Sequence, residues 1–209
     1  MEFNDVLVLG NGESRTCLEL KSFLFNGIVV GCNAIYRDYG VDHLICCDRR
    51  MAIEAVSNAP KSTTIYTRER WVELLNRFPN LIAVPPLPYT GTEREDDPFQ
   101  WGSGGYALLV GCLLSDNISI VGFDLWSKDS KVNNVYKGTQ HYSSKDSNAV
   151  DPNYWIYQIG KIFQSFPNKR FTIYNNKDWK LPDRWKFDNV AVKDITLFVS
   201  EHDQRRNLC

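Results

Sequence analysis

A chain of 209 residues can form one domain with a well-buried core, and a second complete domain would have to be small. Its 43% hydrophobic and 23% charged residues are typical of a globular protein, which disfavours disorder and membrane-spanning architectures. The 24 Lys and Arg residues nearly balance the 25 Asp and Glu residues, so a net charge of -1 gives no reason to expect non-specific binding to nucleic acid or membranes.

The cysteines and the N-terminus indicate a cellular compartment. The six cysteines lie mostly inside apolar patterns, and the adjacent Cys46 and Cys47 would face opposite sides of a strand, which disfavours pairing. Residues 1–5 are acidic and lead straight into a strand, so we expect no signal peptide, and no apolar run has the length of a membrane span. The prediction is a cytoplasmic protein in a reducing environment.

The first predicted unit is an apolar strand over residues 6–9 that runs into Gly10-Asn11-Gly12-Glu13-Ser14. Two glycines followed by polar residues predict a tight turn and a helix start, where backbone N–H groups favour an anion such as a phosphate. The alternative is an ordinary turn whose glycines only satisfy backbone geometry. The pattern lacks the third glycine of the dinucleotide fingerprint.

The remaining elements follow from the apolar periodicity. In chain order, the sequence predicts a helix over 17–24, strands over 27–32 and 43–47 separated by a short turn, a helix over 49–56, a strand over 63–66, a helix over 69–78 and a strand over 81–84. A surface loop over 85–101 leads to an apolar helix over 102–114, a strand over 117–122, a helix over 152–166 and strands over 170–174 and 195–199. Alternating strands and helices predict an α/β fold, with a doubly wound, mostly parallel, Rossmann-like sheet and helices on both faces. Residues 1–209 are interpreted as one nucleotide-binding domain.

Two segments stand apart from this pattern. Residues 127–151 are polar and poor in aliphatic side chains, which predicts a mobile lid that contains Tyr136, His141 and Tyr142. Residues 176–209 form a C-terminal extension with two tryptophans, which could pack on its own domain or on a neighbour. The oligomeric state therefore stays open, and a homo-oligomer is one option.

Polar residues follow several predicted strands. In an open α/β sheet, ligands bind at the carboxyl ends of the strands beside a topological switch point. Ser103 is a plausible N-cap of the apolar helix, and small residues such as Gly104 allow that helix to approach the sheet. The predicted nucleotide-binding residues are Gly10, Asn11, Gly12, Ser14, Asn33, Asp48, Ser103, Gly104 and Asp124. Their side chains suit a ribose, a base edge and a phosphate, so the expected ligand is a nucleotide or a nucleotide-sugar.

Arg49 and Arg50 open the helix over 49–56, at the end where the helix dipole disfavours cations. This placement suggests an anionic ligand nearby. The alternative is that both arginines are simply solvated.

Four short motifs occur in one order along the chain: Gly10-Asn11-Gly12-Glu13-Ser14, Cys32-Asn33-Ala34-Ile35-Tyr36, Ser103-Gly104-Gly105-Tyr106 and Gly122-Phe123-Asp124-Leu125-Trp126. Over roughly residues 6 to 175, the sequence resembles the bacterial sialyltransferases that build lipo-oligosaccharide, together with uncharacterised and phage proteins that share their fold. Trp126 stands where the family has a tyrosine, and Asp48 stands where it has an asparagine. Tryptophan could hydrogen-bond a phosphate but could not protonate it.

The resemblance implies a glycosyltransferase that transfers a sugar from a CMP-activated donor to a hydroxyl acceptor, without a metal or other cofactor. Asn11, Asn33 and Ser103 would then bind the nucleotide, and His141 would be the general base. A histidine titrates near neutral pH, which suits that role, although a solvated histidine is an equally good interpretation. Tyr136 and Trp126 are the candidates for assisting the leaving phosphate.

Two other functions remain open. A Mg²⁺-dependent pyrophosphokinase-like transfer would use Asp48 and Asp124 as metal ligands, because carboxylates hold the ion that bridges phosphates. A non-catalytic nucleotide-binding module would need only the glycine turn and Ser103.

Overall fold

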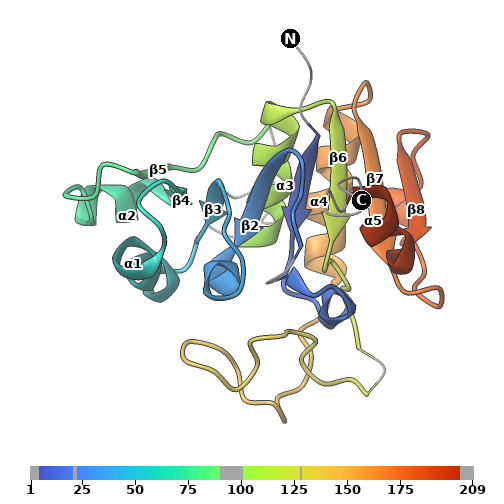
Figure 1. The fold of residues 1–209 in the computed structure, drawn as a ribbon, viewed down its shortest axis with the longest axis horizontal. Coiled ribbons are helices and arrows are strands. Elements are labelled where there is room, and N and C mark those ends of the chain that lie inside the picture. Colours follow the sequence, from blue (N-terminus) through green and yellow to red (C-terminus); the bar gives the residue numbers. More distant parts are fainter. Residues whose placement is uncertain (1–4, 21–22, 90–100, 128, 203–209) are drawn as a thin grey trace, which may run out of the picture.

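The computed structural model describes residues 5–20, 23–89, 101–127 and 129–202. An eight-stranded parallel sheet runs through these residues in the order β5-β4-β3-β2-β1-β6-β7-β8 (Figure 1). Its strands are β1 (Val6–Leu9), β2 (Ile28–Cys32), β3 (His43–Ile45), β4 (Thr64–Thr67), β5 (Leu81–Ala83), β6 (Asn117–Val121), β7 (Arg170–Asn175) and β8 (Val190–Asp194). This arrangement confirms the predicted α/β, Rossmann-like fold.

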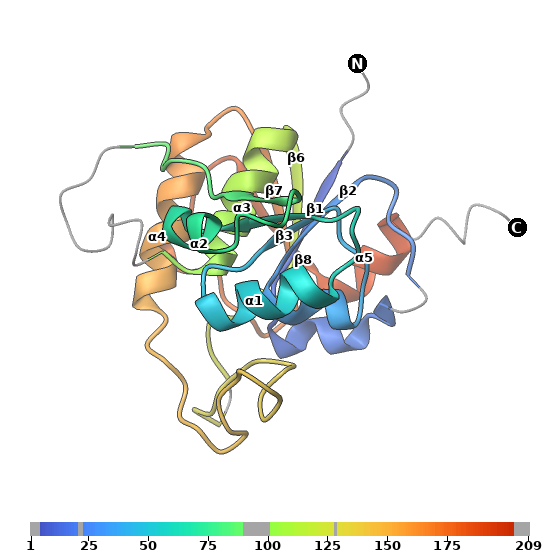
Figure 2. The same ribbon diagram turned by 90° about the vertical axis from the view of Figure 1, so that its left-hand side faces the viewer.

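Helices cover both faces of the sheet (Figure 2). The α-helices are α1 (Arg49–Asn58), α2 (Glu69–Leu74), α3 (Ser103–Leu114), α4 (Asn153–Ser165) and α5 (Ile195–His202), and the 3₁₀ helices are η1 (Glu13–Cys17), η3 (Asn33–Arg37) and η5 (Asp183–Trp185). Side chains of β1 alternate between two cores, because Val6 and Val8 pack with α3 and α4, whereas Leu7 and Leu9 pack with α1 and α5. A strand buried on both faces reads as a continuous apolar run, as residues 6–9 do.

The strand order places a switch point beside β1. The chain adds β2 to β5 on one side of β1 and then returns to add β6, β7 and β8 on the other side. The segment after β1 turns to the face of α1, and the segment after β6 leads to α4 on the opposite face (Figure 2). A crevice therefore opens at the carboxyl ends of β1 and β6, where ligands of such sheets bind.

Two predicted elements are wrong. The glycine turn is followed by the short η1, and no α-helix occupies the described part of residues 17–24. The predicted strand over 195–199 is helix α5, and the eighth strand lies just before it. Asp194 starts the helix, because its Oδ1 accepts hydrogen bonds from Thr196 N at 2.9 Å and Thr196 Oγ1 at 2.7 Å. Ile195 and Phe198 then bury one helical face.

Residues 129–151 lie below the carboxyl edge of the sheet in Figure 1 and are tied to it at several points. Val135 N donates to Asn11 O at 2.9 Å, Asn133 Oδ1 accepts from Glu13 N at 2.7 Å, and Lys137 pairs with Glu13 at 2.6 Å. The segment predicted as a lid is thus anchored over the crevice in this structure. In the described ranges, none of the helices combines the length and apolarity that a bilayer crossing needs.

Candidate functional site

A cavity of about 370 Å³ lies at the carboxyl ends of β1, β2 and β6, within the size range of small-molecule sites. The glycine turn, the end of β2, the start of α3 and the end of β6 form its floor and walls, and residues 132–150 and α4 close its outer side. The lining residues are Gly10, Asn11, Gly12, Cys32, Asn33, Gly102, Ser103, Gly104, Gly105, Gly122, Phe123, Asp124, Leu125, Val132, Asn133, Asn134, Tyr142, Ser143, Ala149, Val150, Trp155 and Ile159. Seven of the nine predicted nucleotide-binding residues are among them.

The glycines of the turn allow two backbones to meet. Gly10 N donates to Val121 O and Gly12 N donates to Gly122 O, each at 2.8 Å. A Cβ on Gly10 would overlap the carbonyl oxygen of Gly122, and a Cβ on Gly12 would overlap the Asp124 carboxylate. These positions therefore need glycine for the close contact between the two backbones, and the same contact forms part of the cavity floor.

Asn11 is 7% exposed and presents an unused acceptor at the cavity. Its Nδ2 donates to Cys32 O at 3.1 Å and to Tyr142 Oη at 3.5 Å, which fixes the orientation of the amide. Its Oδ1 is buried and has no hydrogen-bond partner in the described ranges. An unpaired buried acceptor is costly, so this atom points to a ligand that brings an N–H or O–H donor.

Asn33 and Ser103 form a second polar pair in the same cavity. Asn33 has a φ of 53°, a left-handed conformation that asparagine tolerates better than most residues. Ser103 Oγ donates to Asn33 Oδ1 at 2.9 Å and accepts from Cys47 N at 3.0 Å. Asn33 Oδ1 is thus occupied, which leaves its NH₂ group available to an acceptor on a ligand.

The N-terminus of α3 differs from the prediction in its cap. Gly102 occupies the N-cap position, no side chain caps the helix, and the Ser103 hydroxyl bonds Asn33 and Cys47 instead. Gly102, Ser103, Gly104 and Gly105 all line the cavity. A twelve-residue helix therefore brings its uncapped first turn to the cavity, where backbone N–H groups and the helix dipole favour negative charge.

Asp124 and Ser14 hold the end of β6 against the glycine turn. Asp124 Oδ2 accepts from Ser14 N at 2.7 Å, and Oδ1 accepts from the Ser14 hydroxyl and from Asn175 Nδ2. Asp124 lines the cavity but both of its oxygens are engaged, whereas Ser14 is buried outside the lining. The predicted ligand-binding role of Ser14 is replaced by a structural bond.

Asp48 lies outside the cavity lining. Its Oδ1 accepts from Arg50 N at 2.8 Å and from Met51 N at 3.4 Å, so it is the exposed N-cap of α1. Arg49 lies over the ring of Trp71 at 5.7 Å and Arg50 is exposed, so neither arginine reaches the cavity. Because the Asp48 carboxylate caps the N-terminus of α1, the helix can start with two cations.

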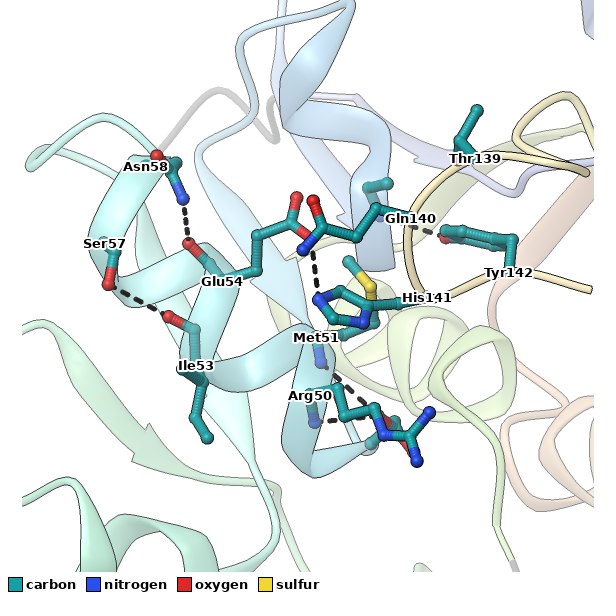
Figure 3. A network of polar contacts seen from close by, with 12 residues as sticks. Arg50, Met51, Ile53, Glu54, Ser57, Asn58, Thr139, Gln140, His141 and Tyr142 are labelled. Carbon is teal, nitrogen blue, oxygen red and sulfur yellow. Dashed lines mark hydrogen bonds and ion pairs between the residues drawn. The ribbon is translucent and has the colours of Figure 1, made fainter.

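His141 also lies outside the lining and is turned toward α1 (Figure 3). Its Nε2 is 3.5 Å from Glu54 Oε2, and Glu54 also accepts three hydrogen bonds from Arg37 and one from the Tyr36 hydroxyl. Arg37 in turn donates to Thr139 Oγ1 at 3.1 Å. This cluster fastens residues 139–141 to η3 and α1, so His141 is a tether here and does not face an acceptor.

The other two catalytic candidates have structural partners. Tyr136 is buried, donates to Asp38 Oδ2 at 2.6 Å and accepts from Arg15 Nη2 at 2.9 Å. Burial raises the pKa of Tyr136, and Asp38 adds to this effect against the opposing charge of Arg15, so the hydroxyl stays protonated at neutral pH. Trp126 stacks on Trp179 with ring centres 6.0 Å apart. Neither Tyr136 nor Trp126 lines the cavity.

Sequence reasoning missed Tyr142, although it lies beside the predicted His141. Tyr142 lines the cavity, and its oxygen accepts from Ala34 N at 3.2 Å. Burial raises the pKa of Tyr142, so its O–H remains a donor at neutral pH. Burial also raises the pKa of the nearby Cys32 thiol to about 12, which excludes a thiolate nucleophile there at neutral pH.

Arg15 is a second residue that the sequence gave no reason to select. It is 4% exposed and lies 3.7 Å from Asp38, and its Nε is buried with no hydrogen-bond partner in the described ranges. A Cβ on Gly122 would lie 3.3 Å from Arg15 Cδ, so this cation sits directly behind the cavity floor. Because Asp38 pairs with this guanidinium, Arg15 contributes little net positive charge to the cavity.

In comparisons with known proteins, no protein family, curated protein or solved structure matches the chain.

Replacing Glu54 by glutamine is expected to cost roughly 1–3 kcal/mol at pH 7, since a largely buried carboxylate loses charge-assisted bonds from Arg37. Burial raises the pKa of Glu54, but hydrogen bonds from Tyr36 and Arg37 outweigh it and leave the pKa lowered. A carboxylate with a lowered pKa stabilises the fold above its unfolded pKa and loses this contribution as pH falls through the folded pKa. Between about pH 6 and pH 3, the free energy of unfolding measured in urea should therefore fall more steeply for the wild type than for Glu54→Gln.

The matched control is Glu73→Gln on the exposed side of α2. It should leave both the stability at pH 7 and the pH dependence close to those of the wild type. If the free energy of unfolding had the same pH dependence in the wild type and in Glu54→Gln, the stabilising role of the Glu54 contacts would be contradicted.

Proposed function

We propose that the cavity binds a nucleotide that carries a single phosphate, as in a CMP-activated sugar, and that the protein transfers the sugar to a hydroxyl acceptor. The observation that carries this proposal is the unpaired, buried Oδ1 of Asn11 in a cavity shared with Asn33 and Ser103. These three side chains come from segments far apart in the sequence. A buried acceptor without a partner has a physical explanation if a ligand completes it.

The hydrogen-bonding groups of the cavity suit the parts of a nucleotide. Asn11 Oδ1 can accept from a ribose hydroxyl or a base amino group. Asn33 NH₂ and the Tyr142 O–H can donate to hydroxyl or carbonyl oxygens. The uncapped first turn of α3 can hold phosphate oxygens, as helix N-termini do in other nucleotide sites.

The charge balance favours one phosphate over two. Asp124 is the only charged side chain among the described residues that line the cavity, and Ser14 and Asn175 satisfy its oxygens. The positive contribution is a helix dipole worth roughly half a charge, because Arg15 behind the floor is paired with Asp38. A nucleotide diphosphate would bring more negative charge to this helix end than a nucleotide with a single phosphate.

The residues do not fit the magnesium-dependent alternative. Asp48 caps α1 outside the cavity, and both oxygens of Asp124 are engaged. In the ranges that the structure describes, no group of three or more His, Cys, Asp or Glu side chains is arranged to hold a metal ion. The pyrophosphokinase-like function therefore lacks the paired carboxylates on which it was based.

In the proposed reaction, the bond between the anomeric carbon and the phosphate oxygen breaks, and the acceptor oxygen forms the new bond to that carbon. CMP leaves with the phosphate oxygen, and the acceptor proton must pass to a base. His141 can serve as this base only after its contact with Glu54 opens and residues 139–141 rearrange. That orientation favours the second candidate, a nucleotide-binding module without catalysis.

Calorimetric titration with CMP, CDP, UDP, GDP and ATP tests the binding step. CMP should bind in the micromolar range and the diphosphates more weakly, with no change on adding EDTA. Absence of heat with every nucleotide would end the proposal, and loss of binding in EDTA would restore the metal-dependent alternative. Formation of free CMP from a CMP-sugar, dependent on an added hydroxyl acceptor, separates the transferase from the binding module.

A further inference from the structure

The two outer strands of the sheet differ in how their open edges are protected. Strands β5 and β8 lie at opposite ends of the sheet (Figure 1), and within the described ranges each pairs with one neighbouring strand. The open edge of such a strand offers backbone N–H and C=O groups to another chain, so proteins usually keep edge strands short or place proline in them. Strand β5 has this protection, and strand β8 lacks it.

The edge of β5 has few groups to offer. The strand has three residues, and Val84 N, just after it, bonds β4, so the neighbouring Ala83 and Pro85 direct their backbone groups outward. Pro85 has no N–H to donate. The other outward donor, Leu81 N, bonds Phe78 O at 3.1 Å. A second strand would therefore find almost no donors along this edge.

The edge of β8 is longer and contains no proline. Phe171 N on β7 donates to Asn189 O at 2.9 Å, so odd-numbered residues of this stretch face β7. Since successive residues of a strand alternate, Val190, Val192 and Asp194 direct their backbone groups outward. Val190 N bonds a carbonyl of the preceding turn at 3.0 Å. The outward groups that another strand can reach are Val190 O, Val192 N, Val192 O and Asp194 N.

These outward groups are self-complementary about Val192. In an antiparallel pair centred on this residue, Val192 of one copy exchanges both backbone hydrogen bonds with Val192 of a second copy. Asp194 N of each copy then meets Val190 O of the other. A two-fold axis between the two Val192 residues generates both sets of bonds, as in closed dimers. Every outward group named for β8 thus obtains a partner.

The side chains of β8 are compatible with this register. Val192 is 41% exposed and would lie opposite Val192 of the second copy. Ala191 would lie opposite Lys193, whose Nζ is held by the Glu201 carboxylate of α5 at 2.9 and 3.0 Å. Among residues 190–194, the register places no two like charges opposite each other, an arrangement that would be destabilising.

We propose that β8 pairs in this antiparallel register with β8 of a second copy, which gives a homodimer with one sheet running through both subunits. The paired strand is short, so the dimer should be weak, with a dissociation constant on the order of 10–100 µM. The cavity lies at the ends of β1, β2 and β6, away from this edge. The proposal therefore does not depend on the nucleotide.

Sedimentation equilibrium of the full-length protein, from about 5 to 500 µM, tests the association. The wild type should approach the mass of a dimer at the upper end of this range. Val192→Lys sets two ammonium groups opposite each other and should weaken the dimer at least about tenfold. The matched control is Ile82→Lys on β5, because Ile82 is also 41% exposed, and it should associate as the wild type does. Urea unfolding checks that each variant is folded.

A mixture of Val192→Lys and Val192→Glu tests the register. Each variant alone should stay monomeric where the wild type associates, and the mixture should form a heterodimer, since opposite charges then face each other across the axis. A wild type that remains monomeric at about 500 µM, or a dimer that Val192→Lys leaves unchanged, would overturn the proposal. A mixture that fails to associate would overturn the antiparallel register centred on Val192.

Discussion

Replacing Gly10 by alanine is expected to destabilise the protein by about 3 kcal/mol or more, and this is the largest stability effect that the structure predicts at the site. A Cβ at Gly10 would overlap the carbonyl oxygen of Gly122 and lie 2.8 Å from the Phe123 ring. The first of these neighbours is backbone and cannot rotate away. The turn must therefore separate from the end of β6, which breaks the bonds from Gly10 N to Val121 O and from Gly12 N to Gly122 O.

Gly40 provides the matched control for this prediction. A Cβ there meets no atom within 4 Å, and its backbone is not in the left-handed region. Gly40→Ala should be neutral or should stabilise the fold by up to about 1 kcal/mol, because alanine restricts the unfolded chain. Urea unfolding of both variants measures the contrast, and similar stabilities for the two would contradict the close approach of β1 and β6.

Replacing Asn11 by alanine is expected to weaken CMP binding by about tenfold to a hundredfold, which corresponds to roughly 1.4–2.8 kcal/mol. The substitution removes the buried Asn11 Oδ1, which has no hydrogen-bond partner among the residues that the structure describes. It also removes the donor to Cys32 O, so a smaller loss of stability, about 1–2 kcal/mol, should accompany it. Calorimetry gives the affinity and urea unfolding gives the stability.

The control for Asn11 is Asn58→Ala, which removes an exposed asparagine on α1 whose Nδ2 bonds only within that helix. Its affinity for CMP should equal that of the wild type. An Asn11→Ala protein that is folded and binds CMP normally would show that the unpaired Oδ1 has another cause.

The fold class could be predicted from the sequence because most of its strands are marked by local apolar patterns. Residues 6–9 form a short apolar run, and residues 117–122 are rich in β-branched apolar residues and end in glycine; both patterns are typical of a buried parallel strand. Residues 195–199 show the limit of such patterns. These five apolar or β-branched residues suit a strand as well as a helix. The hydrogen bond from Thr196 N to the Asp194 carboxylate and the burial of Phe198 stabilise the helix.

The floor of the site could be predicted for a related reason. Polar residues that follow parallel strands, such as Asn11 and Asn33, meet at one edge of the sheet wherever the strands themselves are correct. Asp48 follows β3, farther from the switch point, and its carboxylate turns to cap α1.

The part of the site beyond the strands could not be predicted. Residues 129–151 have no periodic pattern, so nothing in the sequence shows which of their side chains point inward. His141 was selected for its chemistry, yet the tether to Glu54 turns it away and Tyr142 reaches the cavity instead. Trp155 was hidden because its helix is amphipathic and a tryptophan in such a helix is ordinarily part of the core.

The central claim is that Asn11, Asn33 and the start of α3 serve one nucleotide. The most direct measurement is a titration of CMP into ¹⁵N-labelled protein, followed at the side-chain amides of Asn11 and Asn33 and the backbone amides of Gly104 and Gly105. The account predicts that these signals shift together and saturate with one dissociation constant. Shifts that are absent at millimolar CMP, or that cluster instead around Arg49 and Arg50 at the start of α1, would contradict it.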